Sequence, residues 1–238
     1  MQNSHLRIFS AGSFRYALAD LMANLDTLGM QISTEFGPAG ILRERIEQGE
    51  TCDIFISANT AHIKTLSQYL QIVEQKTIAH NQLALTLRNL PEYQAYSSVE
   101  ILLNKRLKIG SSTPIFDPSG DYTWQLFDVI EQHFPCEGKR LKQQTKQLVG
   151  GKTTPQIPAD ILPSRYFIET GVVDVFIGYA HYGQRVGTGF CQKLFAPPFQ
   201  MIAQYGAARL TNNEAAQYFF SQLSQPKAQQ IIRANGFI

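Results

Sequence analysis

The segment EFGPAGILRERIEQGETCDIFISAN, residues 35–59, joins the end of one apolar run to a second apolar run through a turn of small residues and a helical pattern. In the helical part, Ile41, Leu42 and Ile46 fall on one face and charged residues fall on the other, which is the spacing of an amphipathic helix. The apolar run at 52–58 has the length of a buried strand. The segment therefore predicts a strand–helix–strand unit.

The same alternation extends in both directions along the chain. Residues 6–11 predict a strand, Ser13 opens an amphipathic helix, and residues 30–36 predict the next strand, so the first part of the chain is predicted as βαβαβ. Helices are expected at 122–134 and near the C-terminus. Further strands are expected at 82–88, 106–112, 173–180 and 199–207. This pattern predicts an α/β protein with mostly parallel sheets flanked by helices.

The composition is that of an ordinary globular chain and gives no indication of binding to nucleic acid or to a membrane. The chain has 238 residues, enough for one large domain or two lobes of roughly 100 residues each. A net charge of +2 with 17% charged residues gives no electrostatic grip on nucleic acid or anionic lipid. No segment approaches the ~20 apolar residues of a spanning helix, so we expect no insertion into a membrane.

Neither a disulfide framework nor a metal site is indicated. The three cysteines, Cys52, Cys136 and Cys191, are widely spaced, and the five histidines are scattered without a pair at ligand spacing. We therefore expect no bare metal cation held by side chains and no cofactor. The N-terminus lacks the basic and apolar pattern of a signal peptide, which leaves open a cytoplasmic chain or a mature secreted form.

Small residues follow three of the predicted strands, and each group precedes a helix. These groups lie at 10–13, 37–40 and 110–120. In open α/β sheets ligands bind beyond the carboxyl ends of strands, and helix N-termini there offer free amides to an anion. Each corner taken alone is more typical of a helix cap or a turn than of a ligand site. Together they favour a site for an anion or a small polar ligand.

The residues at these corners resemble a known family, the molybdate-binding proteins of ABC importers. The resemblance covers nearly the whole chain and is closest to a subgroup with DPSGDY and LVGG segments. It is carried by IFSAGSFRYAL (8–18), the segment 35–59, GSSTPIFDPSGDYTW (110–124) and PKAQQIIRANGF (226–237). The resemblance implies a two-lobed type II periplasmic binding protein, with a tetrahedral dianion held in the cleft between the lobes by neutral donors.

The family's organisation implies lobe 1 at residues 1–82 with 197–238, and lobe 2 at 83–196. It further implies that the chain is a monomeric, periplasmic solute-binding protein, that its ligand is molybdate or tungstate, and that its partner is an ABC permease.

The resemblance also implies which residues contact the ligand. Ser13 matches a family serine that offers its hydroxyl and amide, and Tyr179 matches a tyrosine whose hydroxyl donates from the second lobe. Ser119 matches a small residue whose amide points at the ligand, and Ile161 matches a position that contributes a backbone amide. At the second corner the family usually has a serine, whereas this chain has Ala39 and Gly40, so only backbone donors are expected there. The lost hydroxyl leaves open another oxyanion or an organic phosphate.

Two other functions are compatible with the sequence. A cytoplasmic sensor or store for an oxyanion or organic phosphate would use the same fold. An enzyme would use Asp117 and Asp121, which flank the third corner, as acid and base. We favour a non-enzyme, because Asp117 is expected to cap or brace the turn and Asp121 to interact with the dipole of the following helix.

Overall fold

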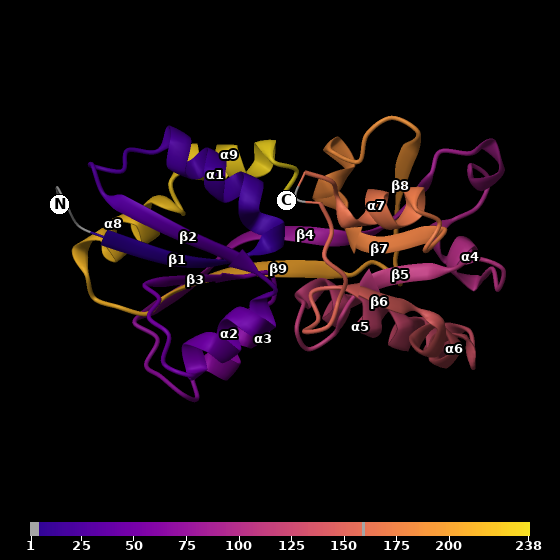
Figure 1. Cartoon of the computed structure of the whole chain (residues 1–238), viewed down its shortest axis with the longest axis horizontal. Coiled ribbons are helices and arrows are strands. Elements are labelled where there is room, and N and C mark those ends of the chain that lie inside the picture. The colour runs from indigo at the N-terminus through magenta and orange to yellow at the C-terminus, as the bar shows by residue number, and fades with distance from the viewer. Residues whose placement is uncertain (1–4, 159) are drawn as a thin grey trace. The chain divides into compact units, whose positions relative to one another are not determined.

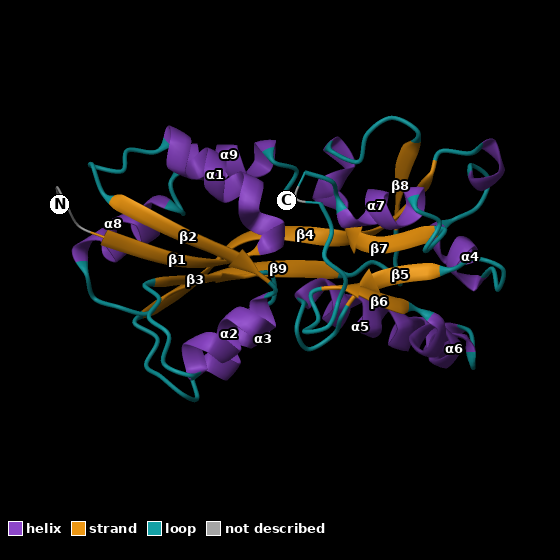
Figure 2. Ribbon diagram, in the orientation of Figure 1, coloured by secondary structure: helices purple, strands orange, loops and turns teal. Residues whose placement is uncertain are grey.

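The computed structural model describes residues 5–158 and 160–238 and divides them into two compact units. Unit 1 contains the chain up to His80 together with Gln204–Ile238, and unit 2 contains Asn81–Ala203. The chain enters unit 2 within strand β4 (Glu74–Arg88) and returns to unit 1 within strand β9 (Ile202–Arg209). Figures 1 and 2 show the elements of each unit.

The sheet of unit 1 has the strand order β2-β1-β3-β9. Strand β1 (His5–Ala11) pairs in parallel with β2 (Gln31–Gly37) and with β3 (Ile54–Ser57), and β9 runs antiparallel to β3. The βαβαβ pattern predicted from the sequence is confirmed. Because parallel strands leave their carboxyl ends at one edge of a sheet, the turns after β1 and β2 are neighbours.

Helices cover both faces of the unit 1 sheet. Helices α1 (Arg15–Asn24) and α9 (Pro226–Ala234) lie on one face, and α2 (Ala39–Glu47) and α3 (Thr60–Leu66) lie on the other (Figure 1). A short 3-10 turn, η1 (Gly12–Phe14), joins β1 to α1, and α8 (Glu214–Gln222) follows β9. The apolar side chains of β1 and β3 between these layers are fully buried: Leu6, Ile8, Phe9, Ile54, Phe55 and Ile56.

The sheet of unit 2 has the order β4-β7-β5-β6, and β8 also pairs with β4. Strand β5 (Ile109–Ser112) is parallel to β6 (Lys146–Val149) and to β7 (Val175–Tyr179). Strand β4 is antiparallel to β7 and to β8 (Phe190–Leu194). The parallel pair of β5 and β7 again places two carboxyl ends side by side.

Helices of unit 2 flank this sheet. Helices α5 (Pro118–His133) and α6 (Glu137–Gln144) pack together on one face, and α7 (Pro163–Glu169) lies on the other face (Figure 2). The remaining short elements are η2 (Pro91–Tyr93), α4 (Ser98–Leu103) and η3 (Ala180–Gln184). Within the part of the chain that the structure describes, no helix has the length and apolar character needed to cross a membrane.

Two elements begin earlier than the sequence predicted. Helix α5 starts at Pro118, four residues before the expected Tyr122, because Asp117 caps it and a proline is tolerated at the first helical position. Strand β4 starts at Glu74, although residues 74–77 are largely exposed and polar. Strands β6 and β8 were not predicted at all, since each is only four or five half-exposed residues long.

Candidate functional site

In unit 1, the predicted site residues Ser13, Ala39 and Gly40 lie at two neighbouring strand ends. Ala11, the last residue of β1, pairs with Gly37, the last residue of β2. Ser13 follows Ala11 by two residues, and α2 begins at Ala39, two residues after Gly37. The sheet therefore brings these three residues to one edge of unit 1.

The first turn of α2 offers backbone donors at this edge. The N-cap of α2 is Pro38, and among the described residues no side chain caps the helix. The first amides of a helix have no partner within it, so those of Ala39 and Gly40 depend on an acceptor from outside the helix. Both residues are buried. A small anion at this edge would meet these amides and the positive end of the helix dipole.

Ser13 has a side-chain partner that the sequence did not predict. Its Oγ accepts a hydrogen bond from the hydroxyl of Tyr205 at 2.8 Å. Tyr205 lies on β9, is fully buried, and packs against the rings of Phe14 and Phe237 with centroids 5.9 and 5.0 Å apart. Nothing in the local sequence links positions 13 and 205, because the contact depends on β9 joining the sheet beside β3.

In unit 2, two predicted site residues lie near the neighbouring ends of β5 and β7. Tyr179 is the last residue of β7 and is buried, and Ser119 is the second residue of α5, which follows β5. The amide of Thr113 donates to the carbonyl of Val149 at 2.8 Å, which ties the end of β6 to the same edge. The structure thus brings Ser119 and Tyr179 to adjacent strand ends of unit 2.

The third corner differs from the prediction in its donors. The backbone amide of Ser119 was expected to point at the ligand, but it donates to Oδ1 of Asp117 at 2.9 Å. The amide of Gly120 donates to the Asp117 carbonyl, also at 2.9 Å. Asp117 therefore uses the amides of this corner, as expected of a capping residue. The amide of Ile161, the other predicted backbone donor of this unit, lies 3.3 Å from the carbonyl of Pro158, to which it donates.

Two hydroxyl groups remain at the third corner. Among the residues that the structure describes, Oγ of Ser119 and Oγ1 of Thr113 are buried and have no hydrogen-bond partner. Ser119 is only 4% exposed. Buried hydroxyls are normally paired, so these two groups are candidate hydrogen-bonding groups for a ligand. The sequence did not single out Thr113, although a threonine at the end of a strand and before a proline was a usable signal.

Glycines allow the close packing of this corner. A Cβ atom on Gly120 would lie 2.5 Å from the backbone nitrogen of Pro114, so the first turn of α5 reaches the end of β5 only with glycine there. Gly150 has φ of +77°, and its Cβ would lie 2.6 Å from Oδ2 of Asp117. Only glycine combines that backbone conformation with such a contact. The two glycines therefore allow the first turn of α5 and the Asp117 cap to pack this closely.

Asp117 and Asp121, the two aspartates that an enzyme would use, both accept hydrogen bonds from the backbone of the third corner. Asp117 caps α5, and Oδ1 of Asp121 accepts from the amide of Ile115 at 2.6 Å. The capping role expected of Asp117 is confirmed, whereas Asp121, expected to interact with the helix dipole, also binds the backbone of the preceding turn. Within residues 5–158 and 160–238, no group of three or more His, Cys, Asp and Glu side chains is arranged to hold a metal ion.

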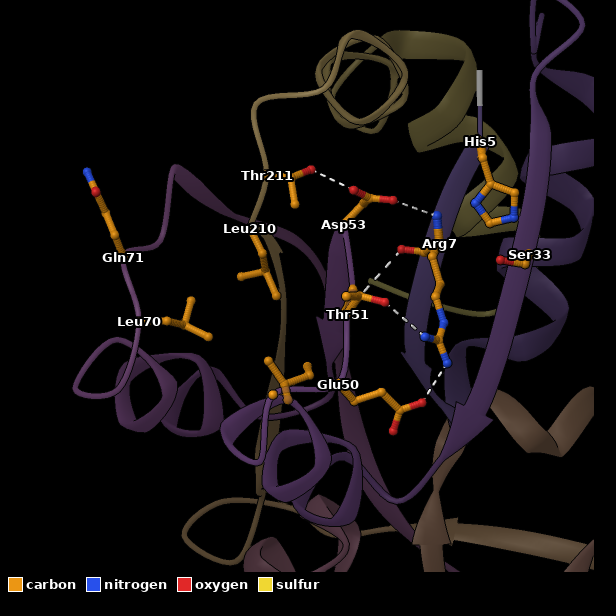
Figure 3. A pocket seen from close by; sticks show the side chains of 13 residues that line it. His5, Arg7, Ser33, Glu50, Thr51, Asp53, Leu70, Gln71, Leu210 and Thr211 are labelled. Atoms are coloured by element: carbon orange, nitrogen blue, oxygen red, sulfur yellow. Dashed lines mark hydrogen bonds and ion pairs between the residues drawn. The ribbon is translucent and has the colours of Figure 1, made fainter. Parts of the chain in front are cut away.

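A hollow of about 680 Å³ lies at the other edge of the unit 1 sheet, where β1 begins and the chain enters β3 (Figure 3). Its polar groups bond to each other. Asp53 accepts from the amide of Arg7 at 2.8 Å and from the hydroxyl of Thr211 at 2.6 Å. The Arg7 guanidinium donates to Glu50 and Thr51. These bonds tie strands and loops together, so the hollow is not the candidate site.

An ion-pair cluster borders this hollow. Arg45 binds both Glu35 and Glu50, and Arg7 also pairs with Glu50. The guanidinium groups of Arg7 and Arg45 each lie 4.9 Å from the ring centre of Phe9. Hydrogen bonds from Arg45, and then from Arg7, lower the pKa of Glu50 to about 2, and Arg45 also lowers the pKa of Glu35. The four charges compensate each other and leave no net charge for a ligand.

Comparison with known proteins identifies the family to which this chain is related. The family model of bacterial extracellular solute-binding proteins matches residues 6–238. An uncharacterized protein of Pasteurella multocida (strain Pm70) is 33% identical over 237 residues, which cover 98% of each chain.

Two solved structures show the fold. The periplasmic molybdate-binding protein of Azotobacter vinelandii superposes with a TM-score of 0.77 at 16% identity, covering 98% of each chain. The sulfate-binding protein SubI of Mycobacterium tuberculosis superposes with a TM-score of 0.78 at 13% identity, covering 99% of this chain and 86% of the other. The predicted fold, that of the type II periplasmic binding proteins, is confirmed, and at this identity the likeness does not select a ligand. By its match over residues 6–238, the chain belongs to the family of bacterial extracellular solute-binding proteins.

Proposed function

We propose that this solute-binding protein captures a tetrahedral oxyanion, molybdate or tungstate, in the periplasm and delivers it as a monomer to the permease of an ABC importer. The observation that supports this most is the grouping of hydrogen-bond donors in unit 1 where strands β1 and β2 end. There the Ser13 hydroxyl and the uncapped first turn of α2, at Ala39 and Gly40, lie at adjacent strand ends. An anion is the ligand that such donors bind best.

The donors of this proposal are neutral. Unit 1 would contribute the Ser13 hydroxyl and the α2 amides, and unit 2 the hydroxyls of Ser119 and Tyr179. The Ile161 amide would join them only by exchanging its bond to the Pro158 carbonyl for one to the ligand. Neutral hydroxyl and amide dipoles that are fixed before binding stabilise an anion strongly when water is excluded. They also bind only from defined directions, so they distinguish a tetrahedral anion from a planar one.

Molybdate and tungstate are the ligands that the resemblance of the corner segments favours. The second corner departs from that resemblance, because Ala39 stands where the family usually has a serine, and its buried side chain offers no donor. Loss of a hydroxyl donor to a charged oxygen typically costs about 1.5–3 kcal/mol unless another donor replaces it, and the Ser119 hydroxyl is a candidate replacement.

Isothermal titration calorimetry with purified protein tests this proposal. Molybdate, tungstate, sulfate, phosphate and glycerol 3-phosphate are titrated separately at pH 8. We expect one-site binding of molybdate and tungstate at micromolar affinity or tighter, and binding of sulfate at least tenfold weaker. Binding of glycerol 3-phosphate alone would assign the site to organic phosphates. The absence of a heat of binding for all five compounds would contradict an oxyanion site.

A pair of variants locates the site in the same experiment. Ser13→Ala removes a proposed donor hydroxyl of unit 1, and Tyr179→Phe removes a proposed donor hydroxyl of unit 2. Each should weaken molybdate binding by about tenfold or more, since a hydrogen bond to a charged group contributes about 1.5–3 kcal/mol. The melting temperature serves as the control for folding. Unchanged affinity in both variants would show that the anion binds elsewhere.

A further inference from the structure

We propose that His181, held in one neutral form by Asn81, is a further hydrogen-bond donor to the ligand, beside Tyr179 in unit 2. The inference rests on the proposed anion-binding function and adds to it a binding residue outside the set that the resemblance implies. His181 contacts the anion through Nε2, whereas Asn81 is a positioning residue that acts through His181.

His181 lies just beyond the end of a strand whose last residue belongs to the proposed site. Strand β7 ends at Tyr179, and the turn η3 carries His181 two residues farther along the chain. The two rings are neighbours, with centroids 6.1 Å apart and an interplanar angle of 42°. In open α/β sheets the residues beyond the carboxyl ends of strands are those that meet ligands. His181 therefore has the position of a binding residue.

The hydrogen bond between Asn81 and His181 has only one possible direction. Both side chains are buried, and Nδ2 of Asn81 lies 2.6 Å from Nδ1 of His181. The oxygen of the same amide, Oδ1, accepts from the backbone amide of Gln82 at 2.8 Å. This second bond fixes the orientation of the Asn81 amide, so its nitrogen faces the ring. An amide nitrogen only donates, and Nδ1 of His181 is therefore an acceptor without a hydrogen.

The form of the imidazole follows from this bond. The imidazolium cation has a hydrogen on both nitrogens, so a ring whose Nδ1 accepts a hydrogen bond is neutral and has its hydrogen on Nε2. Nε2 of His181 can then only donate. Neutral donors that are fixed before binding are the kind of group of which the proposed site consists. His181 adds one more such donor to unit 2 without adding a charge.

Two substitutions of His181 distinguish its two nitrogens. The amide nitrogen of glutamine can occupy the place of Nε2, whereas asparagine reaches only the place of Nδ1. Calorimetry with molybdate at pH 8 compares both variants with the wild type, and melting temperatures serve as the control for folding. His181→Asn should weaken molybdate binding about tenfold, and His181→Gln less than about threefold. Equal losses in the two variants would show that the ring acts by its size and would overturn the proposal.

A control and a double variant complete the calorimetry. His133→Asn makes the same change at the C-terminal end of α5 in the same unit, where Nδ1 lies 2.9 Å from the carbonyl oxygen of Val129. It should leave the affinity unchanged. Asn81→Leu should weaken binding about three- to tenfold in the wild type and have no further effect in His181→Asn, if Asn81 acts only through His181. Independent effects of the two substitutions would overturn the positioning role of Asn81.

NMR spectra of protein with ¹⁵N-labelled histidine provide a readout that a purely structural role would not change. The signals of His181 are assigned by their absence from His181→Gln. At pH 8 the free protein should show His181 with a bare Nδ1 and a protonated Nε2. Saturating molybdate should shift the Nε2 signal of His181 more than any signal of His133. A protonated Nδ1, or an Nε2 signal that molybdate leaves unchanged, would overturn the proposal.

The possible failures are distinguishable. If the wild type binds molybdate and His181→Asn binds it equally well, the role of His181 is wrong and the anion site stands. A wild-type protein that binds no molybdate at millimolar concentration would overturn the proposed function itself, and the role of His181 with it.

Discussion

The backbone amide of Ser119 donates to the carboxylate of Asp117 at 2.9 Å, two residues earlier in the chain. This contact makes Asp117 the N-cap of α5, and it is the hydroxyl of Ser119, not its amide, that has no hydrogen-bond partner among the described residues. Substitutions at the two positions should therefore affect different properties. A change of Asp117 should lower the stability of the protein, and a change of Ser119 should lower its affinity for the ligand.

Asp117→Ala should destabilise unit 2 without weakening anion binding. The change removes the cap of a sixteen-residue helix, which typically costs about 1 kcal/mol. It also takes a negative charge away from the corner and frees the Ser119 amide, so anion affinity should not fall. Urea unfolding followed by circular dichroism measures the first effect and calorimetry the second. Asp117→Asn, which keeps a capping oxygen, should retain most of the stability; equal losses in both variants would contradict the cap.

Ser119→Ala should leave the free protein as stable as the wild type or slightly more stable, yet weaken molybdate binding by about tenfold or more. The reason is that the buried hydroxyl has no hydrogen-bond partner among the described residues, so its removal costs the free chain no bond. Thr123→Val is the matched control on the same helix. Its buried hydroxyl donates to the Ser119 carbonyl at 2.7 Å, so this variant should lose about 1 kcal/mol of stability and keep its affinity. The opposite pattern in the two variants would show that Ser119 is structural.

The sequence predicted those parts of the fold that depend on local pattern. The strand–helix–strand unit of residues 35–59 is confirmed because its apolar positions repeat at the period of each element and Gly37 and Pro38 separate them. The capping role of Asp117 was predictable for the same reason, since an Asp before a Pro is a local signal of a helix start.

The remaining features depend on contacts between distant segments. Ser13 and Tyr205 are 192 positions apart and meet only because β9 joins the sheet next to β3. The amide of Ser119 was assigned to a ligand because the resemblance gives positions and not hydrogen-bond partners. Strand β8 has no alternating or apolar pattern of its own, and its pairing with β4 defines it as a strand.

The three cysteines should react with a thiol reagent in the order of their exposure. Cys136 is exposed and Cys191 is half-buried, whereas Cys52 is buried and its pKa is raised to about 12 by burial. At pH 8 the Cys52 thiol is therefore almost entirely un-ionised, and the thiolate is the reactive form. Ellman's reagent at pH 8 should therefore label Cys136 first and Cys191 more slowly, with Cys52 labelled only in urea. Mass spectrometry of the labelled peptides checks the order, and fast labelling of Cys52 in the native protein would contradict its burial.

The cluster of Arg7, Arg45, Glu35 and Glu50 predicts a defined loss of stability in acid. Hydrogen bonds from Arg45 and Arg7 hold the pKa of Glu50 at about 2 in the folded protein, against an ordinary value of 4.5. A carboxylate with a lowered pKa contributes stability that is fully present above its unfolded pKa and is lost as the pH falls through its folded pKa. The contribution of Glu50 should therefore be complete at pH 6, decline below about 4.5 and vanish near pH 2.

Melting curves of the wild type and Glu50→Gln between pH 7 and pH 2.5 test this window. The variant should melt at a lower temperature at pH 7, because the amide keeps the shape of the carboxylate but not its charge-assisted bonds to Arg45. The difference between the two proteins should shrink steadily below pH 4.5, because the unfolded wild type then takes up a proton at Glu50 that the folded protein binds only near pH 2. Glu92→Gln, at an exposed position of unit 2, is the control and should change the curve at no pH. A difference that persists undiminished at pH 2.5 would mean that Glu50 stabilises unit 1 by packing, because only the ionic contribution disappears on protonation.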